Sequence, residues 1–111
     1  MSIRPTTDKV REAIFNILHH QEDNRVSFKN VLDLFAGTGA MGIEALSKGA
    51  ETVTFVDNDP KAVKIIKRNL DSCGFAERAV IIAKDVQSAL KLLSKKGEKF
   101  DLIIIDPPYN S

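Results

Sequence analysis

Apolar and polar residues alternate along this chain in blocks that predict strands and helices in turn. From Asn30 onward, four apolar runs predict strands at Val31–Phe35, Thr52–Val56, Ala79–Ala83 and Phe100–Ile105. Stretches such as Leu102–Ile105 are apolar at every position, which is typical of strands covered on both faces of a parallel sheet. The connections are long enough for right-handed crossovers, so the pattern predicts a doubly wound α/β domain.

Apolar residues at helical spacing predict a helix after each of the first three strands. The first helix covers about Met41–Lys48, with Gly49 as its C-cap. The second starts at Pro60, because Asp59 is a good N-cap and proline is favoured at the first helical position, and Gly74 ends it. Its inward face is expected to carry Ala62, Ile66, Leu70 and Cys73.

The third of these helices is predicted to be amphipathic, with Val86, Ala89, Leu90 and Leu93 on its apolar, inward face, and Gly97 breaks it. Another helix is predicted near the N-terminus, where Thr6–Asp8 supply a cap and a first-turn acid. Its apolar stripe is expected to be Val10, Ala13, Ile14, Ile17 and Leu18. The pattern therefore predicts a single domain with an N-terminal helix and loop at residues 1–28 and an α/β core at 29–111.

Composition narrows the possible classes of protein. The 111 residues suffice for one domain, and 16 basic and 15 acidic residues leave a net charge of +1, so contact with nucleic acid would be local. No apolar stretch is long enough to span a membrane. Cys73 is the only cysteine, which excludes an internal disulfide and favours a reducing cytoplasm. No metal site is expected, because His19 and His20 lack partners at ligand spacing.

A glycine-rich segment follows the first strand. Gly37–Gly42 fits the pattern G-x-G-x-x-G and lies between a predicted strand and a predicted helix, which is the context that this pattern requires. Glycines there allow a tight turn and let a ligand approach backbone N–H groups at a helix N-terminus. A simple turn needs only one glycine, so Gly37 and Gly39 together favour a binding loop.

Carboxylates stand at the ends of the next two strands. Asp57 lies twenty residues after Gly37, where a carboxylate can accept hydrogen bonds from a ribose diol. The alternative is a turn or helix cap, although Asp59 already fills that role. Asp85 ends the third strand and has an equally good alternative, because it could cap the helix that starts at Val86.

The fourth strand ends in Asp106, Pro107, Pro108 and Tyr109. Proline cannot donate to a sheet and restricts the residue before it, so the backbone leaves the sheet in a stiff loop. That loop presents a carboxylate, free carbonyls and an aromatic ring, which suit a planar group bearing an amine. The alternative is a rigid exit from the strand without chemistry.

Two nucleoside cofactors fit these strand ends, a nicotinamide dinucleotide and S-adenosyl-L-methionine. Asp33 helps to separate them, because it lies inside the first strand, where a buried acid must have a partner. The ammonium group of S-adenosylmethionine is one natural partner, and NAD has no such group. The alternative is that local backbone N–H groups satisfy Asp33.

Together the motifs resemble a known family. Asp33–Gly39, Val56–Asp59, Asp85 and Asp106–Tyr109 are similar to the ordered motifs of class I S-adenosylmethionine-dependent amino-methyltransferases. The opening segment, Arg4–Glu12 with Phe15 and Asn16, resembles more specifically the RsmD-type methyltransferases that act on guanine N2 of bacterial small-subunit ribosomal RNA. The resemblance implies a Rossmann-like parallel sheet of strand order 3-2-1-4.

The resemblance also implies a cofactor site for S-adenosyl-L-methionine. Gly37–Gly39 would pack against the methionine part, and Asp33 would hold its amine. Asp57 would bind the ribose hydroxyls, with Asn58 beside the adenine and Asp85 accepting from its amino group. The full expected set is Asp33, Phe35, Ala36, Gly37, Thr38, Gly39, Asp57, Asn58, Asp85 and Val86.

On the substrate side, the resemblance implies that Asp106 and the Pro107 carbonyl accept hydrogen bonds from the target amine, while Tyr109 stacks on the base. Pro108 belongs to the same catalytic motif. Ribosomal RNA or the small ribosomal subunit would be the partner, with weaker candidates for RNA contact at Arg4, Thr6, Lys9 and Arg11. Helix-surface charge is the alternative for those four residues. Similar motifs also serve adenine, cytosine and glutamine amines, so the target stays open.

The chain departs from the family in its length. Family members continue past Asp106–Tyr109, so we expect a truncated product in which the strand Phe100–Ile105 is left as an apolar edge open to self-association. Two other readings remain. One is an inactive cofactor-binding fragment. The other is a module of an NAD-dependent oxidoreductase, which would leave Asp33 and the terminal motif without a role.

Overall fold

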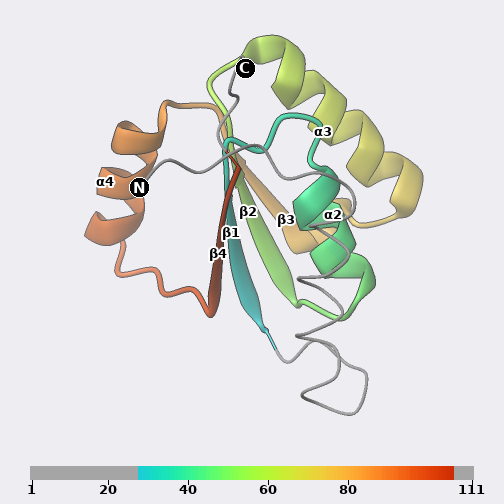
Figure 1. Ribbon diagram of the computed structural model, residues 1–111, viewed down its shortest axis with the longest axis horizontal. Coiled ribbons are helices and arrows are strands. Elements are labelled where there is room, and N and C mark those ends of the chain that lie inside the picture. The colour runs from blue at the N-terminus through green and yellow to red at the C-terminus, as the bar shows by residue number, and fades with distance from the viewer. Residues whose placement is uncertain (1–27, 107–111) are drawn as a thin grey trace.

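The fold is known from a computed structural model, which describes residues 28–106. Four parallel strands form one sheet in the order β3-β2-β1-β4 (Figure 1). Their bounds are β1 (Asn30–Leu34), β2 (Thr52–Val56), β3 (Ala79–Ile82) and β4 (Leu102–Ile105). The expected doubly wound α/β fold and its strand order are confirmed. The helix expected after Thr6–Asp8 lies outside the described residues.

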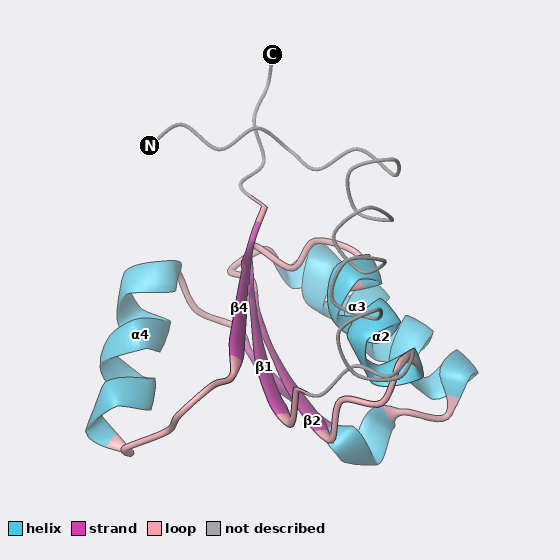
Figure 2. Cartoon of the chain, turned by 60° about the horizontal axis from the view of Figure 1, so that its bottom comes forward, coloured by secondary structure: helices cyan, strands magenta, loops and turns pink. Residues whose placement is uncertain are grey.

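Helices lie on both sides of the sheet. Helices α2 (Ala40–Ser47) and α3 (Pro60–Cys73) cover one face, and α4 (Val86–Lys95) lies on the other (Figure 2). A 3-10 turn at Ala76–Arg78 leads from α3 into β3. None of the helices described between residues 28 and 106 is long and apolar enough to cross a bilayer.

The face under α2 and α3 holds the larger apolar core. Val31, Val53 and Phe55 are completely buried there, against Ile66 and other residues of the two helices. The caps of α3 are those expected. The Asp59 side chain accepts from the Lys61 backbone N–H at 2.9 Å, and Gly74 ends the helix with φ 75°.

The prediction that Cys73 faces inward on α3 is wrong. Cys73 is exposed, whereas Ala62, Ile66 and Leu70 are buried. Cys73 is the last residue of the helix, and residues 71–74 are all exposed. The helical spacing of apolar residues therefore continues for one turn beyond the part of α3 that packs against the sheet.

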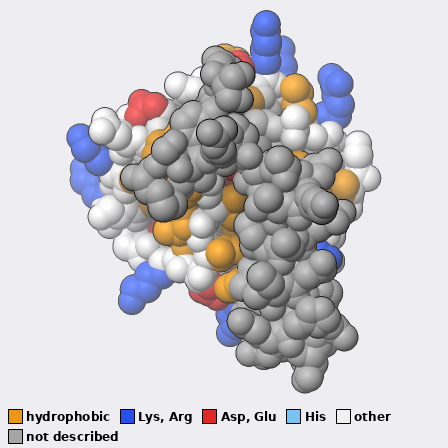
Figure 3. Space-filling view, in the orientation of Figure 1, with side chains coloured by type: hydrophobic (Ala, Val, Ile, Leu, Met, Phe, Trp, Pro, Cys, Tyr) orange, Lys and Arg blue, Asp and Glu red, His pale blue; other side chains and the backbone are white. Residues whose placement is uncertain are grey.

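The face under α4 is less completely covered. Leu32, Leu34, Val56 and Ile82 pack there against Ala89 and Leu93 of the helix. Leu90, expected to face inward, is 41% exposed, because a single helix touches the sheet along a narrow stripe. Apolar side chains reach the surface in the view of Figure 3.

The expectation that β3 and β4 are covered on both faces is therefore wrong for the described residues. Val80 is 48% exposed and Ile103 is 51% exposed, since α4 is narrower than the four-stranded face that it covers. β4 is an outer strand of this sheet. Self-association through its edge stays a prediction.

Strand register brings the predicted site residues to one edge. Leu34 is level with Val56 on one side and with Ile105 on the other, and Val56 is level with Ile82. The residues that follow the four strands therefore start from the same edge of the sheet. These are the Phe35–Gly39 loop, Asp57, the Lys84–Asp85 segment and Asp106.

Candidate cofactor site

The loop after β1 needs both of its first two glycines. Gly37 has φ 59° and Gly39 has φ 82°, in the left-handed region that glycine adopts at little cost. The Gly39 N–H donates to the Ala36 carbonyl at 2.8 Å and closes the turn. A Cβ on Gly39 would also lie 3.3 Å from a side-chain carbon of Ile66, so α3 packs directly against the loop.

Gly42 serves a different purpose from the loop glycines. A Cβ there would lie 2.3 Å from the Phe55 ring and 2.9 Å from a methyl carbon of Val53. The missing side chain lets α2 approach β2 closely. It also brings the Gly42 N–H to 3.1 Å from Oδ2 of Asp33, to which it donates.

Asp33 is a buried carboxyl on the α2 side of β1. Only 1% of it is exposed. The pKa of Asp33 is raised to about 7, mainly by burial and also by the negative charges of Asp106 and Asp57, and this value includes the opposing effect of the Gly42 hydrogen bond. The expected backbone alternative thus holds for one carboxyl oxygen, Oδ2.

Asp57 ties the glycine loop to the end of β2. Its Oδ2 accepts from the Gly37 N–H at 2.8 Å, and its Oδ1 accepts from the Asp59 N–H at 2.9 Å. The turn-capping alternative is therefore confirmed. It does not exclude a ligand, because each carboxylate oxygen can accept more than one hydrogen bond.

Asp85 is the N-cap of α4, as its alternative interpretation held. Its Oδ1 accepts from the Ser88 N–H at 2.9 Å, and its Oδ2 accepts from the Ser88 hydroxyl at 3.0 Å. These two bonds lower the pKa of the exposed Asp85 carboxyl. Asp85 therefore stays charged at the rim of the site.

Phe35 has an unusual backbone conformation. Its φ of 57° is in the left-handed region, which is rare for a bulky residue and costs conformational energy. Its side chain packs against the core under α4. The turn out of β1 thus carries a strained aromatic residue directly before the glycine loop.

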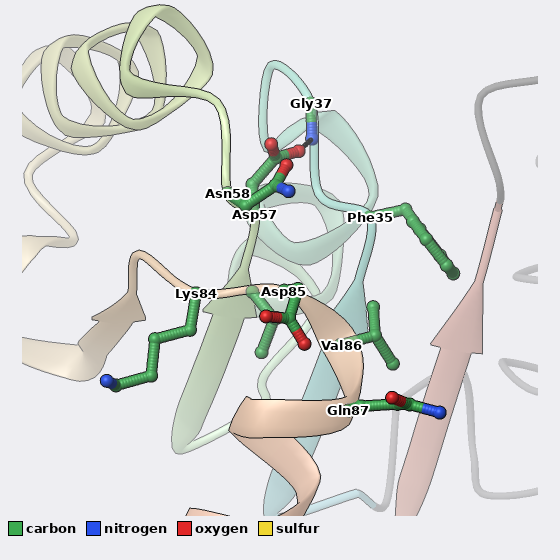
Figure 4. Close-up of a pocket in the computed structure, with 9 residues that line it drawn as sticks. Phe35, Gly37, Asp57, Asn58, Lys84, Asp85, Val86 and Gln87 are labelled. Atoms are coloured by element: carbon green, nitrogen blue, oxygen red, sulfur yellow. Dashed lines mark hydrogen bonds between the residues drawn. The ribbon is translucent and has the colours of Figure 1, made fainter.

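These elements enclose a pocket of about 470 Å³ at the carboxyl ends of β1, β2 and β3 (Figure 4). The pocket wall combines apolar side chains with carboxylates and amides. It is formed by Phe35, Gly37, Val56, Asp57, Asn58, Lys84, Asp85, Val86 and Gln87. A wall that combines apolar side chains with carboxylates suits a nucleoside, whose ring can pack while its hydroxyl and amino groups donate.

Six of the ten expected cofactor residues line the pocket, and they are Phe35, Gly37, Asp57, Asn58, Asp85 and Val86. The other expected residues lie outside its wall, and they are Asp33, Ala36, Thr38 and Gly39. Val56, Lys84 and Gln87 also line the pocket but were not among the expected residues. Their positions next to Asp57, Asp85 and Val86 in the sequence are the signal that could have found them. Lys84 points away from the other labelled side chains (Figure 4).

The remaining predicted residues divide into two groups. Asp106 is half-buried, and its charge acts on Asp33, so the structure brings the ends of β1 and β4 together. The others lie outside the described residues, and they are Pro107, Pro108, Tyr109, Arg4, Thr6, Lys9 and Arg11. No group of three or more metal-ligating side chains occurs among residues 28–106.

This sheet order, with a glycine loop and acids at the strand ends, is the arrangement of class I S-adenosylmethionine-dependent methyltransferases. The family model described as conserved hypothetical protein 95 matches residues 1–111. The chain belongs to this family, the RsmD family that its motifs resemble.

Known proteins agree with this assignment. YlbH of Bacillus subtilis, a candidate rRNA methyltransferase, is 44% identical over 97% of this chain and 56% of its own length. Ribosomal RNA small subunit methyltransferase D of Haemophilus influenzae is 37% identical over 97% of this chain and 54% of its own. The chain thus spans about half the length of the curated relatives that it matches.

A solved structure adds a bound ligand to the comparison. The methyltransferase candidate SMU.776, in complex with S-adenosylhomocysteine, superimposes with a TM-score of 0.73 at 26% identity. The match covers 88% of this chain and 25% of SMU.776.

Proposed function

We propose that this chain binds S-adenosyl-L-methionine in the pocket beside Asp57 and Asp85. One observation carries the proposal. Carboxylates already accept from the N–H groups of the glycine segment, Asp57 from Gly37 and Asp33 from Gly42. Asp57 and Asp85 line the pocket, and the charge of Asp33 lies close enough to act with that of Asp57, so the site favours a cationic nucleoside over an anionic one.

The same observation disfavours the nicotinamide dinucleotide. A pyrophosphate at this helix N-terminus would have to displace two carboxylates from the amides that it needs. It would also bring negative charge towards Asp33, whose pKa the charges of Asp106 and Asp57 already raise. S-adenosylmethionine carries an ammonium and a sulfonium group instead, which these carboxylates attract.

We further propose that the complete protein methylates an exocyclic amino group of ribosomal RNA, at guanine N2 of the small subunit. When bound, S-adenosylmethionine supplies an electrophilic methyl group. Asp106 and the Pro107 carbonyl would accept hydrogen bonds from the two N–H groups of the target amine and favour a pyramidal nitrogen with a localised lone pair. These hydrogen bonds strengthen as positive charge develops on nitrogen, so they act on the transition state.

In that step a bond forms between nitrogen and the methyl carbon as the sulfur–carbon bond breaks, and sulfur keeps the electron pair. The methylated amine then loses a proton to solvent. Tyr109 would stack on the base and hold the nitrogen in line. Orientation of this kind contributes up to roughly 7–11 kcal/mol in well-aligned intramolecular reactions.

The choice of substrate rests on the RsmD family and on the names of relatives. The Haemophilus influenzae relative is named for the small ribosomal subunit. Transfer to in vitro transcribed small-subunit RNA, mapped by mass spectrometry, tests both the molecule and the nucleotide. Methylation of adenine or cytosine in place of guanine would overturn the base assignment.

Two measurements test cofactor and chemistry separately. S-adenosylhomocysteine at one hundred times its dissociation constant should raise the free energy of unfolding by about 2.7 kcal/mol, whereas NADH should not. Asp106→Ala in the complete protein should lower kcat by about 10²–10³-fold with little change in cofactor affinity. Wild-type turnover in that variant would overturn the role of Asp106.

A second function is cofactor binding without catalysis. The observation that favours it is the coverage of about half of each curated relative. A methyl-transfer assay on residues 1–111, run beside the complete gene product, distinguishes the two. Binding of S-adenosylhomocysteine without transfer by the 111-residue chain would establish the second function.

A further inference from the structure

A side chain of α3 holds the middle of the glycine loop. The Asn69 side-chain Nδ2 donates to the Thr38 carbonyl at 2.9 Å, across 31 positions of sequence. A carbonyl oxygen only accepts, so the amide nitrogen must face it. Asn69 is half-buried and is not part of the pocket wall.

The helix meets the loop at a second point. Ile66 lies three residues before Asn69, which places both on the same side of α3. Ile66 packs so closely on Gly39 that a Cβ there would lie 3.3 Å from its side chain. Asparagine is a poor residue for a helix interior, so its presence at this position calls for a local reason.

Between these contacts the loop is held at successive positions. Gly37 is tied through its N–H to Asp57, Thr38 through its carbonyl to Asn69, and Gly39 through its packing on Ile66. Thr38 is itself exposed, so Asn69 is the side chain that restrains this exposed residue. Figure 1 shows the loop between β1 and α2 beside α3.

We propose that Asn69 is a positioning residue for the cofactor, acting through the Thr38 carbonyl. Two glycines make the loop conformationally free, and each binding event must overcome that freedom. Asn69 removes part of this freedom before the ligand arrives, and pre-organisation of this kind lowers the cost of binding. The inference rests on the proposed function, because it assumes that the ordered loop receives S-adenosylmethionine.

Asn69→Ala and Asn69→Asp test the proposal in the complete protein. Loss of one neutral hydrogen bond predicts a rise in the dissociation constant of S-adenosylhomocysteine of about three- to tenfold in Asn69→Ala. Asn69→Asp keeps the shape but sets a carboxylate against a carbonyl, so its loss should be larger. Equilibrium dialysis with labelled ligand measures both.

The control is Lys64→Ala, an exposed position on the same helix. Alanine is a better helix former than asparagine, which offsets part of the lost hydrogen bond, so Asn69→Ala should melt close to the control. In Asn69→Ala the KM for S-adenosylmethionine should rise while the KM for RNA stays at the wild-type value. A general loss of structure would not produce this difference.

Three outcomes are separable. Weaker ligand binding in both Asn69 variants at an unchanged melting temperature supports the proposal. Wild-type affinity in both variants overturns the role of Asn69 and leaves the cofactor assignment intact. No binding of S-adenosylhomocysteine by the wild-type protein overturns the proposed function itself, whatever the variants do.

Discussion

The two faces of the sheet hold their carboxylates in opposite ways. On the α2 and α3 face, Asp33 is 1% exposed, and its pKa is raised to about 7 by burial and by neighbouring negative charge. On the α4 face, Asp85 is exposed, and Ser88 lowers its pKa through two hydrogen bonds.

The packing of the two faces differs in the same way. Under α2 and α3, Val53 and Phe55 are completely buried, and a helix glycine fits against them without room for a methyl group. Under α4, Ile103 is 51% exposed. We therefore expect a substitution on the first face to disturb neighbouring side chains, and a substitution on the second face to have a mainly local effect. Four predictions test this difference.

The largest effect is expected at Asp33. A carboxyl whose pKa is raised on folding contributes stability that is full below its unfolded value, near 3.8, and is lost as pH rises through about 7. Asp33→Asn removes this loss, so at pH 8 it should be more stable than the wild type by about 2–4 kcal/mol. On our proposal that Asp33 attracts the ammonium group of the ligand, Asp33→Asn should also weaken S-adenosylhomocysteine binding at least about tenfold.

Urea unfolding at pH 5 and pH 8 measures the stability effect. The advantage of Asp33→Asn should grow between these two values. The groups that act on Asp33 are Asp57, Asp106 and the Gly42 N–H, and they are unchanged in the variant. Asp71→Asn, an exposed position on α3, is the control and should follow the wild type. Equal stability of Asp33→Asn and wild type at pH 8 would show that the pKa of the Asp33 carboxyl is not raised by folding.

Gly42→Ala should be the next largest effect. Alanine is favoured over glycine in a helix, but its Cβ would lie 2.3 Å from the Phe55 ring. Overpacking of this kind costs about 1–3 kcal/mol. The double variant with Phe55→Leu should recover part of that loss, and urea unfolding of the four proteins gives the coupling. Additive effects would show that the contact with Phe55 is not the cause.

Asp85→Ala should have a smaller effect on stability. It removes the N-cap of α4, so the melting temperature should fall, but by less than in Gly42→Ala. Asp85→Asn should keep the melting temperature close to that of the wild type, because asparagine is also a good N-cap. Thermal unfolding followed by circular dichroism checks both, and an equal fall in the two variants would mean that capping is not what Asp85 contributes.

The smallest effect is expected on β4. Ile103→Thr changes an exposed side chain on the α4 face and should stay within about 0.5 kcal/mol of the wild type. Ile104→Thr changes the next residue, which is 8% exposed on the other face, and should cost about 1–3 kcal/mol. Urea unfolding compares them. Equal losses would remove the distinction between the two faces.

Local patterns predicted most of the fold. Asp59, Pro60 and Gly74 act on the backbone within a few residues of themselves, and they set the bounds of α3. Cys73 and Leu90 were placed wrongly because helical periodicity gives a direction but not the extent of the surface that the helix meets. For the same reason a continuous apolar strand did not reveal that Val80 and Ile103 are exposed.

The site was predictable where each residue acts through its own strand end. Asp57 and Asp85 could be placed from sequence, although their capping bonds left two interpretations open. Asn69 and Thr38 could not be connected, because they are 31 positions apart and only the packing of α3 brings them together. The raised pKa of Asp33 likewise depends on its burial under α2 and on the three-dimensional positions of Asp106 and Asp57.

The burial of Asp33 has a calorimetric consequence. With its pKa raised to about 7, this side chain holds a proton in a substantial fraction of the molecules at neutral pH. If the ammonium group of the ligand lies beside this carboxyl, as we propose, it favours the charged form of Asp33, so ligand binding should expel that proton into the buffer. The heat of S-adenosylmethionine binding should then differ between phosphate and Tris buffers. The difference should equal the difference between the ionisation enthalpies of the two buffers multiplied by the fraction of a proton released.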